Sequence, residues 1–297
     1  MSKTFQIIYI KENIKFNIEI NESDIIFDLK KIIYLNIKGI IPIPQIGLFF
    51  FHDKNKKIKQ NISLTNNSLS LFTEYPKIKE IDKIYLYDTG KQIEILTANI
   101  IEYLGPIITF FIYTSYYGFN NFSKVQYCSF IMSNFHFLKR IFESINIHIH
   151  TKTMELKMLL IECIYYIIYY GLFCEYYLFN NKNLKWDSKI HLGWFIIFFF
   201  CEINNFICHV YLRNIRISNP GEIKIPEGNL FKYICCANYF WEIGSWISIS
   251  FFTKLKSIMF FTFIGAFVMT SWALEKKKMY DKKFGLKNKK AIIPFII

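Results

Sequence analysis

Six long apolar segments constrain the fold of this chain more than any other feature of its sequence. Each is close to the roughly 20 residues that an α-helix needs to cross the hydrocarbon core of a bilayer. Charged stretches separate the segments, as expected for loops in water between membrane helices. We therefore expect a multi-pass all-α membrane bundle of about six to seven transmembrane helices. The segments lie at about residues 95–117, 125–142, 158–180, 190–212, 231–252 and 257–274.

The sequence before the first of these segments is different, because it is polar and rich in Lys. Residues 4–20 contain two stretches that alternate between apolar and polar side chains, which is the period of a half-buried strand. A helical pattern at residues 26–33 and two short strand patterns at 46–51 and 84–87 follow. This order of strands and helix resembles the β-grasp of ubiquitin-like domains, which implies a small α+β domain.

We expect two domains with the boundary near residue 90. Residues 1–90 would form the ubiquitin-like cytosolic domain, and residues 91–297 the transmembrane catalytic domain with a Lys-rich cytosolic tail. The net charge of +13 is concentrated between the apolar segments and in the tail, which favours a topology signal over a nucleic-acid surface. We expect both termini on the cytosolic side and no nucleic-acid partner.

A run of polar residues interrupts the fifth apolar segment. An ionisable residue inside a membrane segment costs several kcal/mol and is therefore a functional-site candidate. Asn238 and Glu242 are four residues apart, so their side chains share one helical face, with Tyr239 adjacent. Tyr239 lies eight residues after the start of the segment, which predicts a depth of about 12 Å below the cytosolic boundary.

A polar stripe follows one face of the fourth segment at intervals of three and four residues. It runs from the middle of the segment to its basic end, where Arg side chains suit a phosphate group. The stripe could therefore line a cleft between a buried reaction centre and a phosphate-bearing ligand. Its residues are Glu202, Asn205, His209, Arg213 and Arg216.

The first two segments add further polar groups. Glu102 interrupts the first, and His136, Lys139 and Arg140 share the last part of the second. We expect no metal site, and we interpret His148 and His150 as loop residues. Neither a Rossmann glycine motif nor a P-loop is present, so a nicotinamide cofactor would have to bind within the helical bundle.

Several sequence blocks in the C-terminal half resemble the steroid 5-alpha-reductase superfamily. Within it, the N-terminal pattern and two further blocks are similar to the very-long-chain trans-2-enoyl-CoA reductase family. The blocks of the superfamily are Leu212-Arg-Asn, Ile225-Pro-Glu-Gly-Asn-Leu-Phe231, Ala237-Asn-Tyr-Phe-Trp-Glu-Ile243 and Ile293-Pro-Phe295. Those of the narrower family are Glu102-Tyr-Leu-Gly-Pro106 and Phe135-His-Phe-Leu-Lys-Arg-Ile-Phe-Glu-Ser144.

The resemblance implies a multi-pass enzyme of the endoplasmic-reticulum membrane. It implies NADPH-dependent reduction of trans-2-enoyl-CoA to saturated acyl-CoA, the last step of the very-long-chain fatty-acid elongation cycle. The expected partners are a long-chain enoyl-CoA, membrane lipid and other elongation enzymes.

The resemblance also implies roles for individual residues. Tyr239 would donate a proton, with Lys139 assisting it or holding phosphate. The expected substrate contacts are Glu102 and His136. The expected cofactor contacts are Asn205, Arg213, Arg216, Asn238, Glu242 and Tyr280.

Two alternatives remain open at this stage. Enoyl reductases of the family often have Pro before the Asn-Tyr pair and a second Tyr two residues later, where this chain has Ala237 and Trp241. That local sequence favours a steroid or polyprenol reductase of the same superfamily. The second alternative is a non-enzymatic membrane scaffold, in which the ubiquitin-like module recruits partners and the polar groups serve helix packing.

Overall fold

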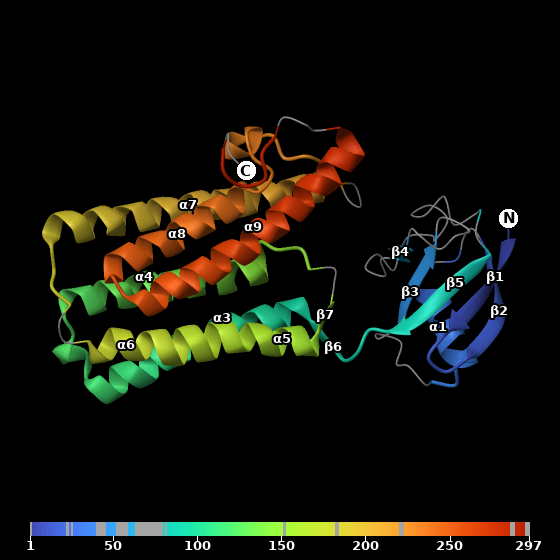
Figure 1. The fold of residues 1–297 in the computed structure, drawn as a ribbon, viewed down its shortest axis with the longest axis horizontal. Helices are drawn as coiled ribbons and strands as arrows, with labels where there is room; N and C mark the ends of the chain where they lie inside the picture. Colours follow the sequence, from blue (N-terminus) through green and yellow to red (C-terminus); the bar gives the residue numbers. More distant parts are fainter. Residues whose placement is uncertain are drawn as a thin grey trace. The chain divides into compact units, whose positions relative to one another are not determined.

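The computed structural model divides the chain into two compact units (Figure 1). The first comprises residues 1–95 and 151–158, and the second residues 96–150 and 159–297. The described residues are 2–21, 24, 26–39, 46–51, 59–62, 80, 82–150, 153–181, 184–219, 223–285 and 289–294.

The first unit contains a five-stranded sheet with the order β2-β1-β5-β3-β4. β1 and β2 form an antiparallel hairpin, and β5 pairs in parallel with β1 and antiparallel with β3. The strands are β1 (Ser2–Tyr9), β2 (Ile14–Asn21), β3 (Ile46–Phe51), β4 (Lys59–Ile62) and β5 (Lys83–Asp88), and helix α1 spans Ile26–Asn36.

Alternation in the hairpin sequence builds the core of this unit. Phe5 and Ile7 of β1 are completely buried, and Ile18 pairs with Phe5 across the hairpin. Leu29 and Ile33, four residues apart on α1, belong to the same buried cluster. The strand periodicity predicted for residues 4–20 is therefore confirmed. A short antiparallel pair, β6 (Gln92–Glu94) with β7 (Thr153–Glu155), completes the unit.

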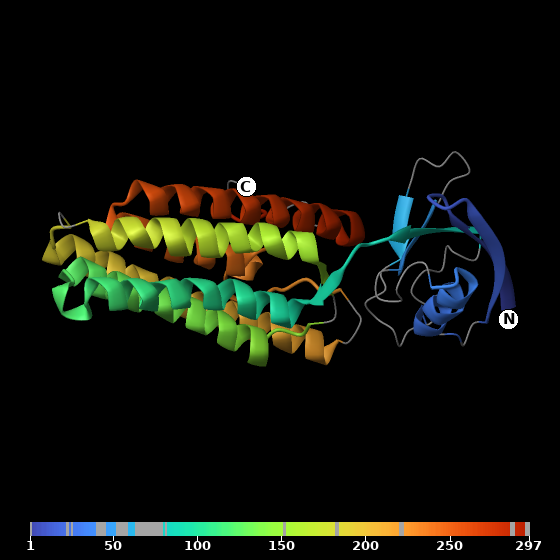
Figure 2. The same ribbon diagram turned by 90° about the horizontal axis from the view of Figure 1, so that it is seen from below.

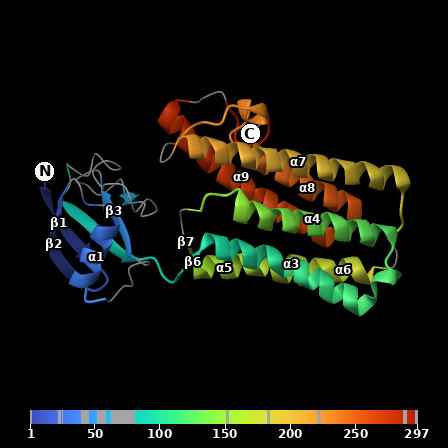
Figure 3. The ribbon, with the colours of Figure 1, turned by 180° about the vertical axis from the view of Figure 1, so that it is seen from behind.

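The second unit is helical, and its long helices run side by side (Figures 1 and 3). α8 packs against α4, α7 and α9, and α4 also packs against α7. The long helices are α3 (Ile95–Tyr117), α4 (Lys124–Asn146), α7 (Ser188–Ser218), α8 (Ala237–Thr253) and α9 (Lys256–Phe284). One further rod consists of α5 (Leu156–Cys163), the π-helical η4 (Ile164–Cys174) and α6 (Glu175–Asn180), and it lies beside α9 (Figure 2).

Among the described residues, four of these helices are long and apolar enough to cross a membrane: α3, α5–α6, α7 and α9. The second and fifth predicted segments also form helices, but neither meets the same criterion. α4 carries charged residues such as Lys139 and Arg140, and α8 has 17 residues. A mostly helical, membrane-type unit joined to a small sheet is thus confirmed.

Aromatic side chains fill the centre of the helical unit. Trp246 of α8 lies 4.8 Å from Phe261 of α9 and 5.1 Å from Tyr170 of η4, between ring centroids. The hydroxyl groups of Tyr170 and Ser133 are 2.6 Å apart, so the buried phenol has a polar partner. This packing holds α4, η4, α8 and α9 together around one layer of rings.

The predicted start of the fifth segment is wrong. The backbone N–H groups of Cys235 and Cys236 donate to the carbonyls of Lys290 and Ala291, so the C-terminal tail holds the chain before α8 in a non-helical conformation. α8 begins only at Ala237, and Tyr239 is its third residue. The depth of about 12 Å expected for Tyr239 from the longer helix therefore does not apply.

Candidate active site

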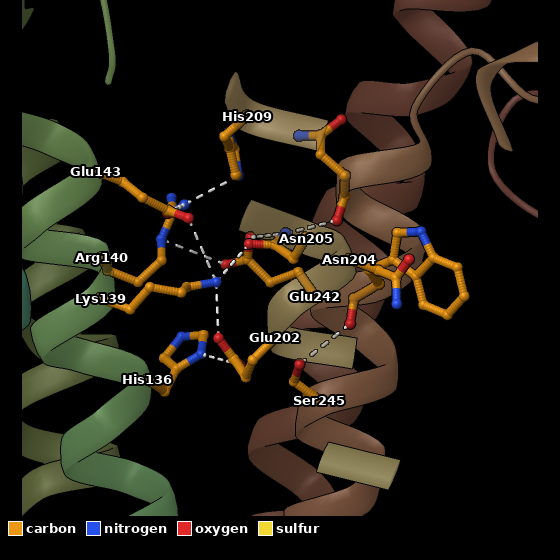
Figure 4. Close-up of polar contacts among 12 residues, drawn as sticks. His136, Lys139, Arg140, Glu143, Glu202, Asn204, Asn205, His209, Glu242 and Ser245 are labelled. Atoms are coloured by element: carbon orange, nitrogen blue, oxygen red, sulfur yellow. Dashed lines mark hydrogen bonds and ion pairs between the residues drawn. The ribbon is translucent and has the colours of Figure 1, made fainter. Parts of the chain in front are cut away.

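A buried charged network joins α4, α7 and α8 (Figure 4). Lys139 of α4 points at α7, with its Nζ 2.7 Å from Glu202 Oε2 and 2.5 Å from Asn205 Oδ1. The side chains of Lys139 and Glu202 are only 8% and 1% exposed. Because an unpaired buried charge is costly, this pair and its hydrogen bonds fix the relative position of the two helices.

His136 lies one helical turn before Lys139 and binds the same carboxylate. Its Nδ1 is 2.7 Å from Glu202 Oε1, and its ring packs 4.7 Å from that of Trp246, between centroids. Glu202 is therefore held by two side chains that the three-residue spacing on α4 places on one face.

Asn205 connects this ion pair to α8. Its Nδ2 donates to the backbone carbonyl of Asn238 at 2.9 Å and lies 3.4 Å from Glu242 Oε2. Its Oδ1 accepts from Lys139. The stripe on α7 and the Asn238–Glu242 face of α8 thus meet.

Arg140 is the centre of a second group of contacts. Its Nη1 donates to Glu143 Oε2 at 2.7 Å, its Nη2 donates to the Tyr103 hydroxyl at 3.1 Å, and its Nε lies 3.7 Å from Glu242 Oε1. Neither Tyr103 nor Glu143 was among the residues selected from the sequence. The three-residue spacing of Arg140 and Glu143 was the available signal for one of them.

The two arginines at the end of α7 lie differently. Arg213 is half-buried and Arg216 is exposed in the last turn of the helix. Within the described part of the chain, neither forms a hydrogen bond or an ion pair. Both guanidinium groups are therefore available to a ligand.

Tyr239 and Tyr280 belong to a separate cluster formed by α8, α9 and the C-terminal tail. The Tyr239 ring lies 6.2 Å from that of Trp272, and its hydroxyl has no hydrogen bond to another described residue. Burial raises the pKa of the neighbouring Cys236 thiol to about 11, so this thiol stays protonated at neutral pH. No contact joins Tyr239 to Lys139 within the described residues.

Glu102 does not join the charged network by a direct contact among the described residues. It is 1% exposed on α3, and its Oε1 has no hydrogen-bond partner among the described residues. The adjacent Tyr103 makes the contact with Arg140 instead.

Comparison with known proteins identifies relatives over most of the chain. Residues 152–297 match the family model described as 3-oxo-5-alpha-steroid 4-dehydrogenase. The very-long-chain enoyl-CoA reductase of Dictyostelium discoideum is 35% identical over 231 residues, which are 72% of this chain and 74% of that protein. A probable very-long-chain enoyl-CoA reductase of Caenorhabditis elegans is 32% identical over 72% of this chain and 75% of its own.

A steroid enzyme matches a shorter part of the chain. The 3-oxo-5-alpha-steroid 4-dehydrogenase 2 of Sus scrofa is 33% identical over 134 residues, 43% of this chain and 50% of that protein. The helical bundle, its buried charges and its steroid-reductase-type C-terminal half define a membrane-type oxidoreductase. Within that class, the chain belongs to the very-long-chain enoyl-CoA reductase family.

Proposed function

We propose that this enzyme reduces the trans-2 double bond of a long-chain enoyl-CoA to give saturated acyl-CoA, with NADPH as the reductant, in the fatty-acid elongation cycle. The observation that carries the proposal is the extent of the similarity. Relatives named as enoyl-CoA reductases match 72% of this chain, whereas the steroid enzyme of Sus scrofa matches 43%.

The residues present fit a nicotinamide dinucleotide. The side-chain oxygen of Asn238 is buried and has no hydrogen-bond partner among the described residues, so it can accept from a carboxamide N–H. Glu242, held by Asn205 and Arg140, lies on the same face of α8. The available guanidinium groups of Arg213 and Arg216 suit the phosphates of NADPH, and Tyr280 would contribute a further contact.

The chemistry divides between the reductant and the protein. NADPH, when bound, supplies the hydride that adds to the β-carbon of the enoyl thioester. Negative charge then develops on the thioester oxygen and the α-carbon, and Lys139 provides nearby positive charge that Glu202 and Asn205 hold in place. Tyr239 donates the proton to the α-carbon, which completes the saturated product.

The position of Tyr239 supports this role in one respect. Its hydroxyl forms no hydrogen bond within the described residues, so its O–H can donate to a bound substrate. His136, and Glu102 beside Tyr103, would line the substrate side of the network. Glu202 would orient His136 as well as Lys139.

We further propose that α4 and α8 cross the membrane together with the four apolar helices, because both pack against α7 within the bundle. Both termini and the opening of the site would be cytosolic, at the endoplasmic-reticulum membrane. The Lys-rich end of α9, with Lys282 and Lys283 in its last turn, supports this orientation. Membrane lipid and other elongation enzymes remain the expected partners.

The first unit would be a ubiquitin-like β-grasp domain, with its boundary near residue 90. The strand order β2-β1-β5-β3-β4 and the parallel β1–β5 pair support this assignment. Its role would be separate from the chemistry, since the residues proposed for catalysis all lie in the second unit.

A panel of substrates tests the proposed function. The purified full-length protein in lipid nanodiscs would be supplied with NADPH and a trans-2-enoyl-CoA, a 3-oxo-4-ene steroid or a polyprenol. We expect NADPH loss only with the enoyl-CoA. Turnover of the steroid or polyprenol alone would establish the second candidate, which the family model and the local sequence at Ala237 and Trp241 favour.

A further inference from the structure

Two histidines and a glutamate form a cluster beside the charged network that the proposed reaction does not use. One ligand atom from each of Glu143, His148 and His209 lies within 4.8 Å of the other two. Glu143 is fully buried, and His209 is 9% exposed. Two elements, the end of α4 and the middle of α7, therefore bring three metal-ligating groups together.

The end of α4 determines where His148 lies. The backbone N–H of His148 donates to the carbonyl of Glu143 at 2.8 Å, which turns the chain back over the last turn of the helix. A hydrogen bond of 2.8 Å between His150 Nε2 and the carbonyl of Ser144 fixes the loop that follows α4. The prediction that His148 and His150 are loop residues is correct, but His148 also faces α7.

The spacing of the two imidazoles matches a shared metal ion. His148 Nε2 and His209 Nδ1 are 3.2 Å apart. Two nitrogens bound to one tetrahedral Zn²⁺ at 2.0–2.1 Å would be about 3.3 Å apart. Glu143 Oε1 is buried and has no hydrogen-bond partner among the described residues, and Lys139 Nζ lies 3.5 Å away. Glu143 supplies one carboxylate oxygen to the cluster, and two His with one Glu is an established zinc ligand set.

Arg140 now occupies one side of this cluster (Figure 4). Its Nη1 lies 3.2 Å from His209 Nε2 and 2.7 Å from Glu143 Oε2. A guanidinium has no acceptor, so His209 Nε2 must accept and the ring must carry its proton on Nδ1. That proton is donated to His148 Nε2, and both rings are neutral.

Metal binding would reverse this arrangement. To offer Nδ1 to an ion, His209 must move its proton to Nε2, with no net gain or loss of protons. Nε2–H would then face a donor of Arg140, and two donors cannot share a hydrogen bond. Arg140 must therefore leave His209 when a metal ion enters.

We propose that Glu143, His148 and His209 bind a divalent transition-metal ion of the Zn²⁺ type, and that the ion displaces Arg140 from His209. Since Arg140 also contacts Tyr103 and lies near Glu242, the ion would slow the reaction. This second consequence rests on the proposed function, whereas metal binding itself does not.

Co²⁺ provides a direct test, because its visible absorption reports coordination geometry and needs no turnover. The full-length protein, purified with a histidine-free tag and treated with EDTA, would be titrated with Co²⁺. We expect one Co²⁺ per chain and loss of its bands when Zn²⁺ is added. His148→Gln should weaken Co²⁺ binding by about 100-fold. Loss of a direct ligand should cost at least as much affinity as loss of a residue that only orients a ligand.

The matched control is His150→Gln, which removes a histidine that is no member of the cluster and keeps an N–H donor for the Ser144 carbonyl. Its Co²⁺ affinity should equal that of the wild type. Absence of Co²⁺ bands in the wild type, or equal affinity in His148→Gln, would overturn the metal site.

The effect on Arg140 is tested separately. Zn²⁺ should slow enoyl-CoA-dependent NADPH loss in the wild type and in His150→Gln, with recovery in EDTA. Undiminished turnover at saturating Zn²⁺ would overturn the displacement of Arg140. If no enoyl-CoA were reduced under any condition, the proposed function would fail, while the Co²⁺ spectra would still decide the metal site.

Discussion

The cores of the two units are built by opposite rules. The first unit buries apolar side chains such as Phe5, Ile7 and Ile33, and Lys30 is the charged side chain buried among its described residues. The helical unit buries Lys139, Glu202 and other ionisable groups at the meeting of three helices. The alternating pattern of the sheet is explained by folding alone. Buried charges cost stability, and they therefore indicate a functional role.

Breaking the charged network should give the largest effect. Glu202→Ala would leave Lys139 and His136 without their shared carboxylate, which should lower the free energy of unfolding by about 3–5 kcal/mol. Denaturation in detergent, followed by Trp fluorescence, measures this loss. The control is Asn204→Ala, because among the described residues its side chain hydrogen-bonds only the carbonyl of Phe200 in its own helix. If both variants lost the same free energy of unfolding, the charged network would not be what stabilises the three helices.

Removing the proposed proton donor should affect turnover and leave the fold intact. Tyr239→Phe deletes one hydroxyl that hydrogen-bonds no described residue, so stability should hold while kcat falls about 100-fold. Single-turnover NADPH oxidation measures the chemical step. Tyr116→Phe, at an 80%-exposed phenol of α3, is the matched control and should be neutral. A Tyr239→Phe enzyme of normal kcat would remove this residue from the mechanism.

A smaller effect should follow at the basic C-terminal end of α7, where Arg216 lies. Arg216→Gln removes a charge that no described residue pairs with, and we expect the KM for NADPH to rise about tenfold with little change in kcat. Steady-state kinetics at several NADPH concentrations checks this. Lys124→Gln removes an exposed cation at the start of α4 and should leave the KM unchanged. A KM unaltered in both variants would place the phosphates elsewhere.

The smallest effect should come from the first unit. Burial lowers the pKa of Lys30 from its ordinary value of 10.5, so the unfolded chain holds this proton more tightly than the folded one. The contribution of Lys30 to stability is therefore most favourable above pH 10.5 and falls as the pH drops toward the lowered pKa. Lys30→Met should stabilise the unit at neutral pH by about 1 kcal/mol.

Hydrogen exchange of α1 in the full-length protein measures this gain. Lys31→Met is the control, because Lys31 is exposed on the same helix. The advantage of Lys30→Met should shrink as the pH approaches 10.5. Faster exchange in Lys30→Met than in the wild type would show that this amine is stabilising.

Local sequence patterns predicted the features that depend on residues close together in the chain. Alternation gave the hairpin of β1 and β2, and the spacing of Glu202, Asn205 and His209 gave the polar face of α7. These contacts depend on periods of two and 3.6 residues, which are visible in one segment.

Contacts between distant segments could not be predicted in this way. Tyr103 reaches Arg140 only because α3 lies beside α4 in the bundle. The true start of α8 depends on the tail at Lys290 and Ala291, more than fifty residues further along the chain. The spacing of residues within one segment carries no information about its contacts with a distant segment.

The central claim is that the helical unit transfers hydride from NADPH to an enoyl-CoA, and the isotope content of the product tests it most directly. With NADPH deuterated at both C4 positions, we expect saturated acyl-CoA with one deuterium at C3. With ordinary NADPH in D₂O, the single deuterium should appear at C2. Acyl-CoA without deuterium from the cofactor, or deuterium only in a reduced steroid, would contradict the account.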